Sequence, residues 1–257
     1  MNSLPTQKFK AVLFDKDGTL LNSIPFWASH TEWLIRTAVV HFAGNLEPAP
    51  QKELTRAVLE SVGIVNGKLT HDALLAGATE IVLFTQIFNT MIASLGASAL
   101  PTLREFKHWC HIEINTRVAA SDEIPDLYPG ALDVLHGLKK QGYILGLATS
   151  DHEKNTMRQF TVLGIQNLFD WFGCVDTVSI PKPNGAGLRE FASALNIAPE
   201  EILMVGDTTI DEDFARDGGA GAFWAIAEYS EAEKKFRGPD RILRSVKEIS
   251  IYEGTAT

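Results

Sequence analysis

Three short apolar segments of this chain each end directly at a cluster of polar residues. Short apolar segments bounded by turn-forming residues are typical of buried strands in a parallel sheet. The carboxyl ends of parallel strands lie at one edge of an open sheet, and ligands bind beyond that edge. The sequence therefore predicts that these polar clusters meet in one crevice. The apolar segments span residues 11–14, 144–147 and 202–205, and the polar clusters follow at 15–20, 148–150 and 206–211.

Strand-like and helix-like segments alternate along the chain after Pro125. Such alternation is typical of βαβ units and predicts an α/β fold with a parallel, doubly wound sheet. In the first helix of this region, Leu132, Leu135 and Leu138 are expected to face inward. The predicted helices span residues 131–140, 154–163, 188–195 and 211–217, and the predicted strands span 143–149, 172–175, 202–205, 222–225 and 241–243, the last before a terminal helix.

The segment between residues 24 and 121 has a different pattern, and no strand is expected in it. Thr102 and Glu105 form a capping-box pattern, which predicts the start of a helix. We therefore expect an all-helical subdomain, residues 24–121, inserted into a core made of residues 1–23 and 122–257. The predicted helices span residues 25–42 and 50–62, run from a cap at Thr70 to a break at 96–101, and start again after Thr102.

Residues 81–95 carry no charged side chain, which makes this segment a candidate for a membrane span. Gln86 and Asn89 interrupt it, and it is shorter than the roughly 18–20 apolar residues that a span requires. A buried helix is therefore the preferred interpretation, and no membrane partner is expected. Such a helix also suits a subunit interface, so a monomer and a homodimer both remain open.

The overall charge and the cysteine content limit the classes of partner and compartment. The formal net charge is −9 at pH 7. Nucleic-acid-binding proteins usually present a basic face, so no nucleic acid partner is expected. Cys110 and Cys174 cannot form a disulfide framework and are expected as buried thiols. Residues 1–10 lack the apolar core of a secretory signal, which predicts a cytoplasmic protein.

Asp15 and Asp17 follow the first predicted strand, which spans residues 8–15. A carboxylate such as Asp15 can attack phosphorus and form an aspartyl-phosphate, which divides hydrolysis into two steps. Asp17 can protonate the leaving oxygen and later deprotonate a water, a role that contributes about 10²–10⁴-fold in rate. Gly18 allows the tight turn that brings both carboxylates to one side. The alternative is a plain Asp-Gly loop after a strand.

Thr149 and Ser150 lie between a predicted strand and a predicted helix. They are expected to bind a phosphate oxygen through a side-chain hydroxyl and nearby main-chain N–H groups, and the alternative is helix N-capping. Asp151 and His152, which follow, are expected as solvated loop residues. Lys182 lies between two prolines on a stiffened loop, where its ammonium can offset phosphate charge. The alternative for it is an exposed loop lysine.

Asp207 and Asp211 bracket a predicted strand-to-helix turn. The Asp207 carboxylate suits a hard cation such as Mg²⁺, which prefers few carboxylates and several waters. Asp211 is expected to bind waters of the same ion or to orient Lys182, and helix capping is the alternative. Asp15, Asp17 and Asp207 placed together without a cation would repel one another, and at least one pKa would rise. Three carboxylates, a hydroxyl and an ammonium in one crevice suit Mg²⁺-assisted phosphoryl transfer.

With motifs at residues 14–20, 148–150, 181–183 and 206–211 in this order, the chain resembles the haloacid dehalogenase-like hydrolases. Within them it is similar to the branch of phosphoglycolate phosphatases and β-phosphoglucomutases, which carry a helical cap. The resemblance implies a Rossmann-like core and Mg²⁺ held by the Asp15 carboxylate, the Asp17 main-chain carbonyl and Asp207. It also implies a phospho-enzyme on Asp15 and phosphate contacts from Thr149 and Lys182.

Two positions depart from the usual family pattern: Lys16, where an apolar residue is common, and Asn22, where an aspartate is common. Neither is expected to touch the chemistry. Asp17 argues against the dehalogenases and the phosphonate-cleaving relatives, which lack an acid there. Trp27 stands where β-phosphoglucomutases typically carry a histidine, which disfavours mutase activity.

The residues and the resemblance together predict a Mg²⁺-dependent phosphatase for a small organic phosphate monoester, of the phosphoglycolate or sugar-phosphate type. The alternatives are a sugar phosphomutase of the β-phosphoglucomutase type and a non-catalytic binding protein on the same fold. Specificity is expected to lie with the helical subdomain, which contains four candidate anion contacts: Arg36, Arg56, Arg104 and Arg117.

Overall fold

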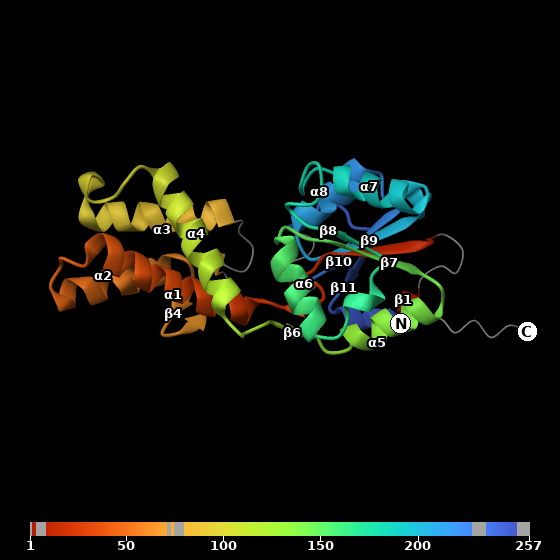
Figure 1. Cartoon of the computed structure of the whole chain (residues 1–257), viewed down its shortest axis with the longest axis horizontal. Coiled ribbons are helices and arrows are strands. Elements are labelled where there is room, and N and C mark those ends of the chain that lie inside the picture. The colour runs from red at the N-terminus through yellow and green to blue at the C-terminus, as the bar shows by residue number, and fades with distance from the viewer. Residues whose placement is uncertain (1, 4–8, 71–72, 75–79, 228–234, 251–257) are drawn as a thin grey trace, which may run out of the picture. The chain divides into compact units, whose positions relative to one another are not determined.

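The computed structural model of the 257-residue chain describes residues 2–3, 9–70, 73–74, 80–227 and 235–250. The chain divides into two compact units, coloured along the chain in Figure 1. Unit 1 combines Met1–Ser23 with Pro125–Thr257, and unit 2 is Ile24–Ile124.

Unit 1 is built on a six-stranded parallel sheet with the strand order β11-β10-β9-β2-β7-β8. The expected doubly wound α/β fold is confirmed. The chain builds the sheet outward from β2 in one direction and then returns to build it in the other, so the order reverses between β2 and β9. Ligands bind at such a switch point in open α/β sheets. The strands are β2 (Ala11–Phe14), β7 (Ile144–Ala148), β8 (Trp171–Gly173), β9 (Ile202–Gly206), β10 (Ala222–Ile226) and β11 (Arg241–Leu243).

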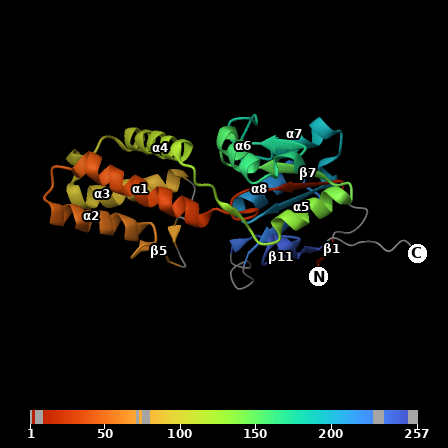
Figure 2. The ribbon, with the colours of Figure 1, turned by 60° about the horizontal axis from the view of Figure 1, so that its bottom comes forward.

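Helices cover both faces of this sheet (Figures 1 and 2). Val12 and Phe14 of β2 pack in one buried cluster with residues of α5 and α6, whereas Ala11 and Leu13 pack in another with α7 and α8. Successive side chains of a strand point to opposite faces, so a strand buried on both sides has to be apolar throughout. The helices are α5 (Ala131–Lys140), α6 (Glu153–Val162), α7 (Ala186–Leu195) and α8 (Thr209–Gly218).

Two expectations about unit 1 are wrong. Leu132 does not face inward but is 41% exposed, and Val134 is buried in its place. The buried stripe of α5 follows positions i, i+3, i+4 and i+7 from Ala131, and Leu132 lies off that stripe. In the described residues β11 is followed not by a terminal helix but by a 3₁₀ turn, Val246–Glu248, and by β12 (Ile249–Ser250), which pairs with β1 (Asn2–Ser3).

The chain leaves and re-enters unit 1 through two short strands that lie side by side. β3 (Leu21–Asn22) pairs in antiparallel fashion with β6 (Asp126–Leu127). This pairing ties together the two segments that flank unit 2 in the sequence.

In its described residues, unit 2 packs four α-helices around its own apolar core. The capping box at Thr102 is confirmed, because its hydroxyl accepts from the Glu105 amide and the Glu105 carboxylate accepts from the Thr102 amide. No helix in the described part of the chain is long and apolar enough to cross a membrane. Cys110 is buried here, as Cys174 is in unit 1, and both are free thiols as expected. The helices are α1 (Ile24–Ala43), α2 (Pro48–Ser61), α3 (Glu80–Leu95) and α4 (Leu103–Ala120).

A small hairpin in unit 2 corrects the expectation that this segment holds no strand. β4 (Ile64–Val65) and β5 (Lys68–Leu69) pair around Asn66 and Gly67, both of which have positive φ. An Asn-Gly pair is the residue choice that such two-residue turns favour. The Thr70 hydroxyl donates to the carbonyl of Gly63, and α3 begins at Glu80. The start of the helix expected after Thr70 lies outside the described residues, because these omit 71–72 and 75–79.

Candidate active site

Asp15 lies at the carboxyl end of the central strand of unit 1. Its amide donates to the carbonyl of Val205 at 2.8 Å, which extends the pairing of β2 with β9. Phe14 pairs with Val205 on one side and with Leu147 on the other. The register therefore brings the residues that follow β2, β7 and β9 to one edge of the sheet, as predicted.

Lys182 is buried among carboxylates rather than exposed on a loop. Its Nζ donates to Oδ1 of Asp15 and to Oδ1 of Asp211, at 2.6 Å in each case. Burial alone would lower the pKa of Lys182, but the charges of Asp15 and Asp211 outweigh it and raise the pKa. The ammonium therefore stays charged and holds two carboxylates in place.

Asp211 both orients Lys182 and caps a helix, the two roles within the protein that the sequence left open. Its Oδ1 accepts from Lys182, while its Oδ2 accepts from the amide of Thr208 at 3.0 Å and from the Thr208 hydroxyl at 2.6 Å. The Thr208 hydroxyl in turn caps the amide of Asp211, which completes a capping box at the start of α8. This capping box fixes the side chain of Asp211, which in turn orients Lys182.

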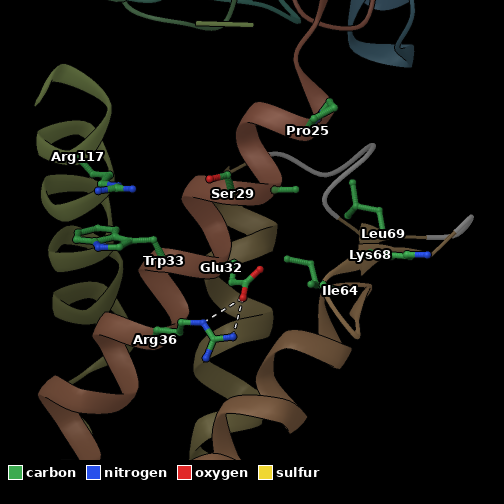
Figure 3. A pocket seen from close by; sticks show the side chains of 11 residues that line it. Pro25, Ser29, Glu32, Trp33, Arg36, Ile64, Lys68, Leu69 and Arg117 are labelled. Atoms are coloured by element: carbon green, nitrogen blue, oxygen red, sulfur yellow. Dashed lines mark hydrogen bonds and ion pairs between the residues drawn. The ribbon is translucent and has the colours of Figure 1, made fainter. Parts of the chain in front are cut away.

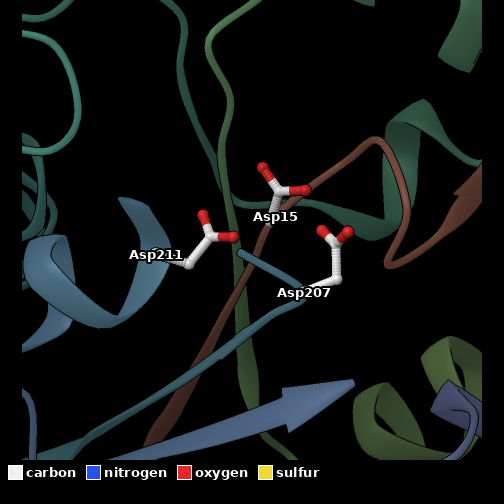
Figure 4. Close-up of side chains that lie close together, drawn as sticks. All are labelled: Asp15, Asp207 and Asp211. Atoms are coloured by element: carbon white, nitrogen blue, oxygen red, sulfur yellow. The ribbon is translucent and has the colours of Figure 1, made fainter. Parts of the chain in front are cut away.

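One carboxylate oxygen from each of Asp15, Asp207 and Asp211 lies within 4.8 Å of the other two (Figure 4). Burial, reinforced by the charge of Asp211, raises the pKa of Asp207 to about 7. Burial also raises the pKa of Asp15 well above its usual range, because repulsion from Asp211 and Asp207 adds to it and attraction by Lys182 does not cancel it. The three carboxylates repel one another when all are ionised, and a divalent cation between them would relieve this repulsion. Carboxylate oxygens are ligands that suit Mg²⁺.

Gly18 and Asp207 approach so closely that no larger residue fits at position 18. Gly18 has φ +85°, and a Cβ built on it would collide with the Asp207 carboxylate. The hydroxyl of Thr19 lies 3.4 Å from Oδ1 of Asp207. The turn after β2 therefore packs directly on the carboxylate that follows β9.

Asp17 lies next to the carboxylate cluster in sequence but its side chain has different partners. Its Oδ2 lies 3.1 Å from Nζ of Lys16. Its Oδ1 is buried and has no hydrogen-bond partner among the residues that the structure describes. Burial raises the pKa of Asp17, because attraction by Lys16 and a hydrogen bond with the Ser23 side chain do not offset burial together with repulsion from Asp151.

Thr149 and Ser150 follow β7 at the same edge of the sheet. Thr149 is buried, and its amide donates to the carbonyl of Gly173 at 2.9 Å. Its hydroxyl accepts from the amide of Asp151 at 3.1 Å. Ser150 is exposed. The N-cap position of α6 is His152, so Thr149 and Ser150 do not cap this helix.

The expectation that Asp151 is a solvated loop residue is wrong, because Asp151 pairs with the buried Lys16. Lys16 is fully buried, and its Nζ donates to Asp151 at 2.6 Å and to Gln159 at 2.7 Å. The Asp151 side chain is only 8% exposed, so it is not a solvated loop residue, whereas the neighbouring His152 is 41% exposed. A lysine directly after a buried strand was the available signal, because a buried ammonium needs anionic partners.

Unit 2 contains a hollow of about 650 Å³ (Figure 3). The guanidinium of Arg117 lies 5.2 Å from the centre of the Trp33 ring, and Arg36 pairs with Glu32 at 2.6 Å. Lys68 of β5 also lines the hollow. Two of the four candidate arginines thus line one hollow with an aromatic wall. The remaining lining residues are Pro25, Ala28, Ser29, Ile64, Gly67 and Leu69.

The fold and the site define a doubly wound α/β protein whose buried carboxylates and lysine meet at the switch point of its sheet. A family model for haloacid dehalogenase-like hydrolases matches residues 9–219. The chain belongs to this family, and the resemblance noted from its four motifs is confirmed.

Similarity to individual proteins extends over nearly the whole chain. Pyrophosphatase PpaX of Bacillus cereus (strain Q1) is 27% identical over 247 residues, which cover 94% of this chain and 95% of that protein. A predicted phosphoglycolate phosphatase from Haemophilus somnus 129PT superposes with a TM-score of 0.61 at 24% identity, covering 93% of this chain and 96% of that one. β-Phosphoglucomutase from Clostridium difficile also superposes at 0.61, with 18% identity and 94% and 93% coverage. These two superpositions establish the fold.

Proposed function

We propose that this protein is a Mg²⁺-dependent phosphatase that hydrolyses a small organic phosphate monoester through a phospho-enzyme on Asp15. The observation that carries this proposal is the Lys182 ammonium shared by Asp15 and Asp211, beside Asp207. Membership of a hydrolase family supports it. In this proposal residues 1–23 and 122–257 are the catalytic core, and residues 24–121 are a cap that selects the substrate.

In the first step a carboxylate oxygen of Asp15 attacks phosphorus. The bond between phosphorus and the ester oxygen breaks, its electron pair stays on that oxygen, and Asp17 supplies the proton that makes it an alcohol. The second step reverses the roles. Water attacks phosphorus, Asp17 takes the proton from the water, and the bond from phosphorus to Asp15 breaks, which releases inorganic phosphate and restores both carboxyl groups.

The groups around Asp15 provide the charge that this chemistry requires. In this proposal Lys182 offsets the negative charge of the phosphoryl oxygens, and Thr149 and Ser150 donate hydrogen bonds to them. Mg²⁺ would be held by Asp15, Asp207 and the main-chain carbonyl of Asp17, and it would supply positive charge at the phosphoryl group. Removal of the metal would then leave the carboxylates of the site uncompensated.

Three classes of substrate are candidates for this site. Phosphoglycolate and sugar phosphates are suggested by the family branch, and pyrophosphate is suggested by the relative PpaX, a pyrophosphatase that is 27% identical. Phosphomutase activity is the second candidate, because β-phosphoglucomutase shares the fold. A non-catalytic binding protein would not require the buried Lys182 between two carboxylates.

We further propose that the protein is a cytoplasmic monomer or homodimer with no nucleic acid or membrane partner.

The test is a panel of phosphate esters and pyrophosphate, incubated with and without Mg²⁺ and assayed for phosphate release. Mg²⁺-dependent release by the wild type, abolished in Asp15→Asn, supports the proposal. A sugar phosphate that is isomerised without release of phosphate would indicate a mutase. Release that persists in Asp15→Asn would refute the assignment of the nucleophile.

A further inference from the structure

Lys16 is a fully buried lysine that lies in the sequence between Asp15 and Asp17, the two aspartates of the proposed reaction. Its side chain is 0% exposed, yet its Nζ contacts three oxygen-bearing side chains. A buried ammonium is tolerated only when it is paired and hydrogen-bonded. The contacts of Lys16 therefore have to form together as the protein folds.

Two of the three partners belong to the segment that leads into and forms α6. Asp151 accepts from Lys16 at 2.6 Å, and its other oxygen accepts from the amide of His152 at 2.7 Å and from Asn155 at 3.3 Å. Gln159, which is 1% exposed, accepts from Lys16 at 2.7 Å. The ammonium is thus fixed to the start and the middle of α6.

The third partner is Asp17, which Lys16 holds by one oxygen. Oδ2 of Asp17 lies 3.1 Å from the ammonium, whereas Oδ1 is buried without a hydrogen-bond partner in the described structure. A buried oxygen without a partner is costly and calls for one that arrives with a ligand. Because one oxygen is held and the other is not, the carboxyl group has a defined orientation.

We propose that Lys16 is a positioning residue for Asp17: it holds Oδ2 so that Oδ1 is the atom that carries the transferred proton. This inference rests on the proposed phosphatase reaction and adds a residue to it. Oδ1–H gives its proton to the ester oxygen as the bond from phosphorus to that oxygen breaks, and Oδ1 later accepts a proton from water. Lys16 keeps its own protons throughout, and Asp151 and Gln159 keep Lys16 in place.

The test compares substrates whose leaving groups differ in their need for a proton. An alkyl phosphate requires protonation of its leaving oxygen, whereas 2,4-dinitrophenyl phosphate releases a stable anion. The quantity to measure is kcat/KM, because it covers only the steps up to release of the alcohol. In Lys16→Met we expect about a 10²-fold loss for the alkyl phosphate and less than about threefold for the dinitrophenyl ester.

A purely structural role for Lys16 would lower kcat/KM equally for both substrates, and that result would overturn the proposal. Gln159→Met, which removes one anchor and no charge, is expected to shift the ratio of the two constants in the same direction by about threefold to tenfold. This variant decides the question if Lys16→Met does not fold, and an unchanged ratio in a folded Gln159→Met would then overturn the proposal. Lys139→Met is the control, because Lys139 pairs with Asp170 at the surface.

Failure of the inference is distinguishable from failure of the proposed function. Asp17→Asn should lose alkyl phosphate hydrolysis in the same selective way as Lys16→Met. If Asp17→Asn shows the selective loss and Lys16→Met does not, only the positioning role is wrong. If wild type releases no phosphate from any ester, the proposed function itself is wrong.

Discussion

Nζ of Lys182 lies 2.6 Å from Oδ1 of Asp15, although 167 positions separate the two residues in the chain. Both side chains are nearly inaccessible, at 4% and 10% exposure. The same ammonium also contacts Asp211 at 2.6 Å. A single cation thus pairs with two carboxylates that would otherwise be buried without compensation, and in the proposed reaction this pairing contributes to activity as well as to stability.

Replacement of Lys182 by Met should impair both properties. Removing one partner of a buried ion pair destabilises a protein by about 3–5 kcal/mol, and loss of a group that offsets developing charge lowers kcat by about 10²–10³-fold. Denaturant unfolding in EDTA and turnover of an aryl phosphate measure the two effects. Lys10→Met, at an exposed pair with Glu201, is the control, and a similar loss in both variants would contradict the prediction.

Mg²⁺ should bind more tightly as the pH rises to about 7. The pKa of Asp207 is raised to about 7, so below that pH the cation has to displace a proton from it. Linkage then predicts a gain in affinity of at least about tenfold per pH unit below neutrality, because Asp15, the second carboxylate ligand, also has a raised pKa and adds to the effect. Titration calorimetry at several pH values measures the slope, and affinity independent of pH between 5.5 and 7 would contradict the assignment.

The metal-free protein should lose stability over the same pH range. Because the pKa of Asp207 in the folded state exceeds its unfolded value of 3.8, its protonation favours the folded state. That contribution is fully present below about pH 4 and is lost as the pH rises to about 7. Thermal unfolding in EDTA should reflect this loss, and excess Mg²⁺ at pH 8 should restore stability. Asp207→Asn should weaken both responses, and the remaining pH response comes from Asp15 and Asp17, whose pKa values burial also raises.

Gly18→Ala should weaken Mg²⁺ binding and activity by more than backbone strain explains. A Cβ at Gly18 collides with the Asp207 carboxylate, whereas Gly142 has a similar φ of +82° and nothing within 4 Å of the same atom. Each substitution incurs about 1–2 kcal/mol of backbone strain. Only Gly18→Ala should also displace the Asp207 carboxylate, and we expect it to lower the affinity for Mg²⁺ by about tenfold or more. The measurement is the Kd for Mg²⁺, with Gly142→Ala as the control.

Arg117→Met should raise KM for substrates that carry a second anionic group, if residues 24–121 select the substrate as we propose and do so through the hollow of unit 2. Arg117 lines that hollow beside Trp33. Loss of one charged hydrogen-bonding group is worth roughly 1.5–3 kcal/mol, or about 10-fold to 10²-fold in KM. Arg56, which pairs with Glu53 and Glu60 at the surface, supplies the control Arg56→Met. An equal KM in the two variants would exclude Arg117 as an anion contact.

Local patterns in the sequence were sufficient to predict most helices and strands. The helix at Ala131–Lys140 and the capping box at Thr102 were predicted correctly, because they depend on side chains within a few positions of one another. The hairpin around Asn66 and Gly67 was missed although its turn signal was present. Its strands are two residues long, which is too short for a period-2 pattern.

The candidate residues Asp15, Asp17, Asp207, Asp211 and Lys182 could be named from the sequence because each follows an apolar strand or lies on a constrained loop. Their pairing could not be named. A carboxylate after a strand has the same local pattern whether it contacts a lysine, caps a helix or faces solvent. Asp211 does the first two at once.

Periodicity and turn chemistry act over a few residues, so the linear order of amino acids was enough to establish an α/β chain with polar groups at the ends of its strands. The partners of Lys16 and Lys182 depend instead on the spatial order β9-β2-β7. That order is set by packing over the whole sheet, and it brings Lys16 to Asp151 and Gln159, 135 and 143 positions away. Burial then makes these long-range ion pairs obligatory, because a charge removed from water needs a partner wherever the fold can supply one.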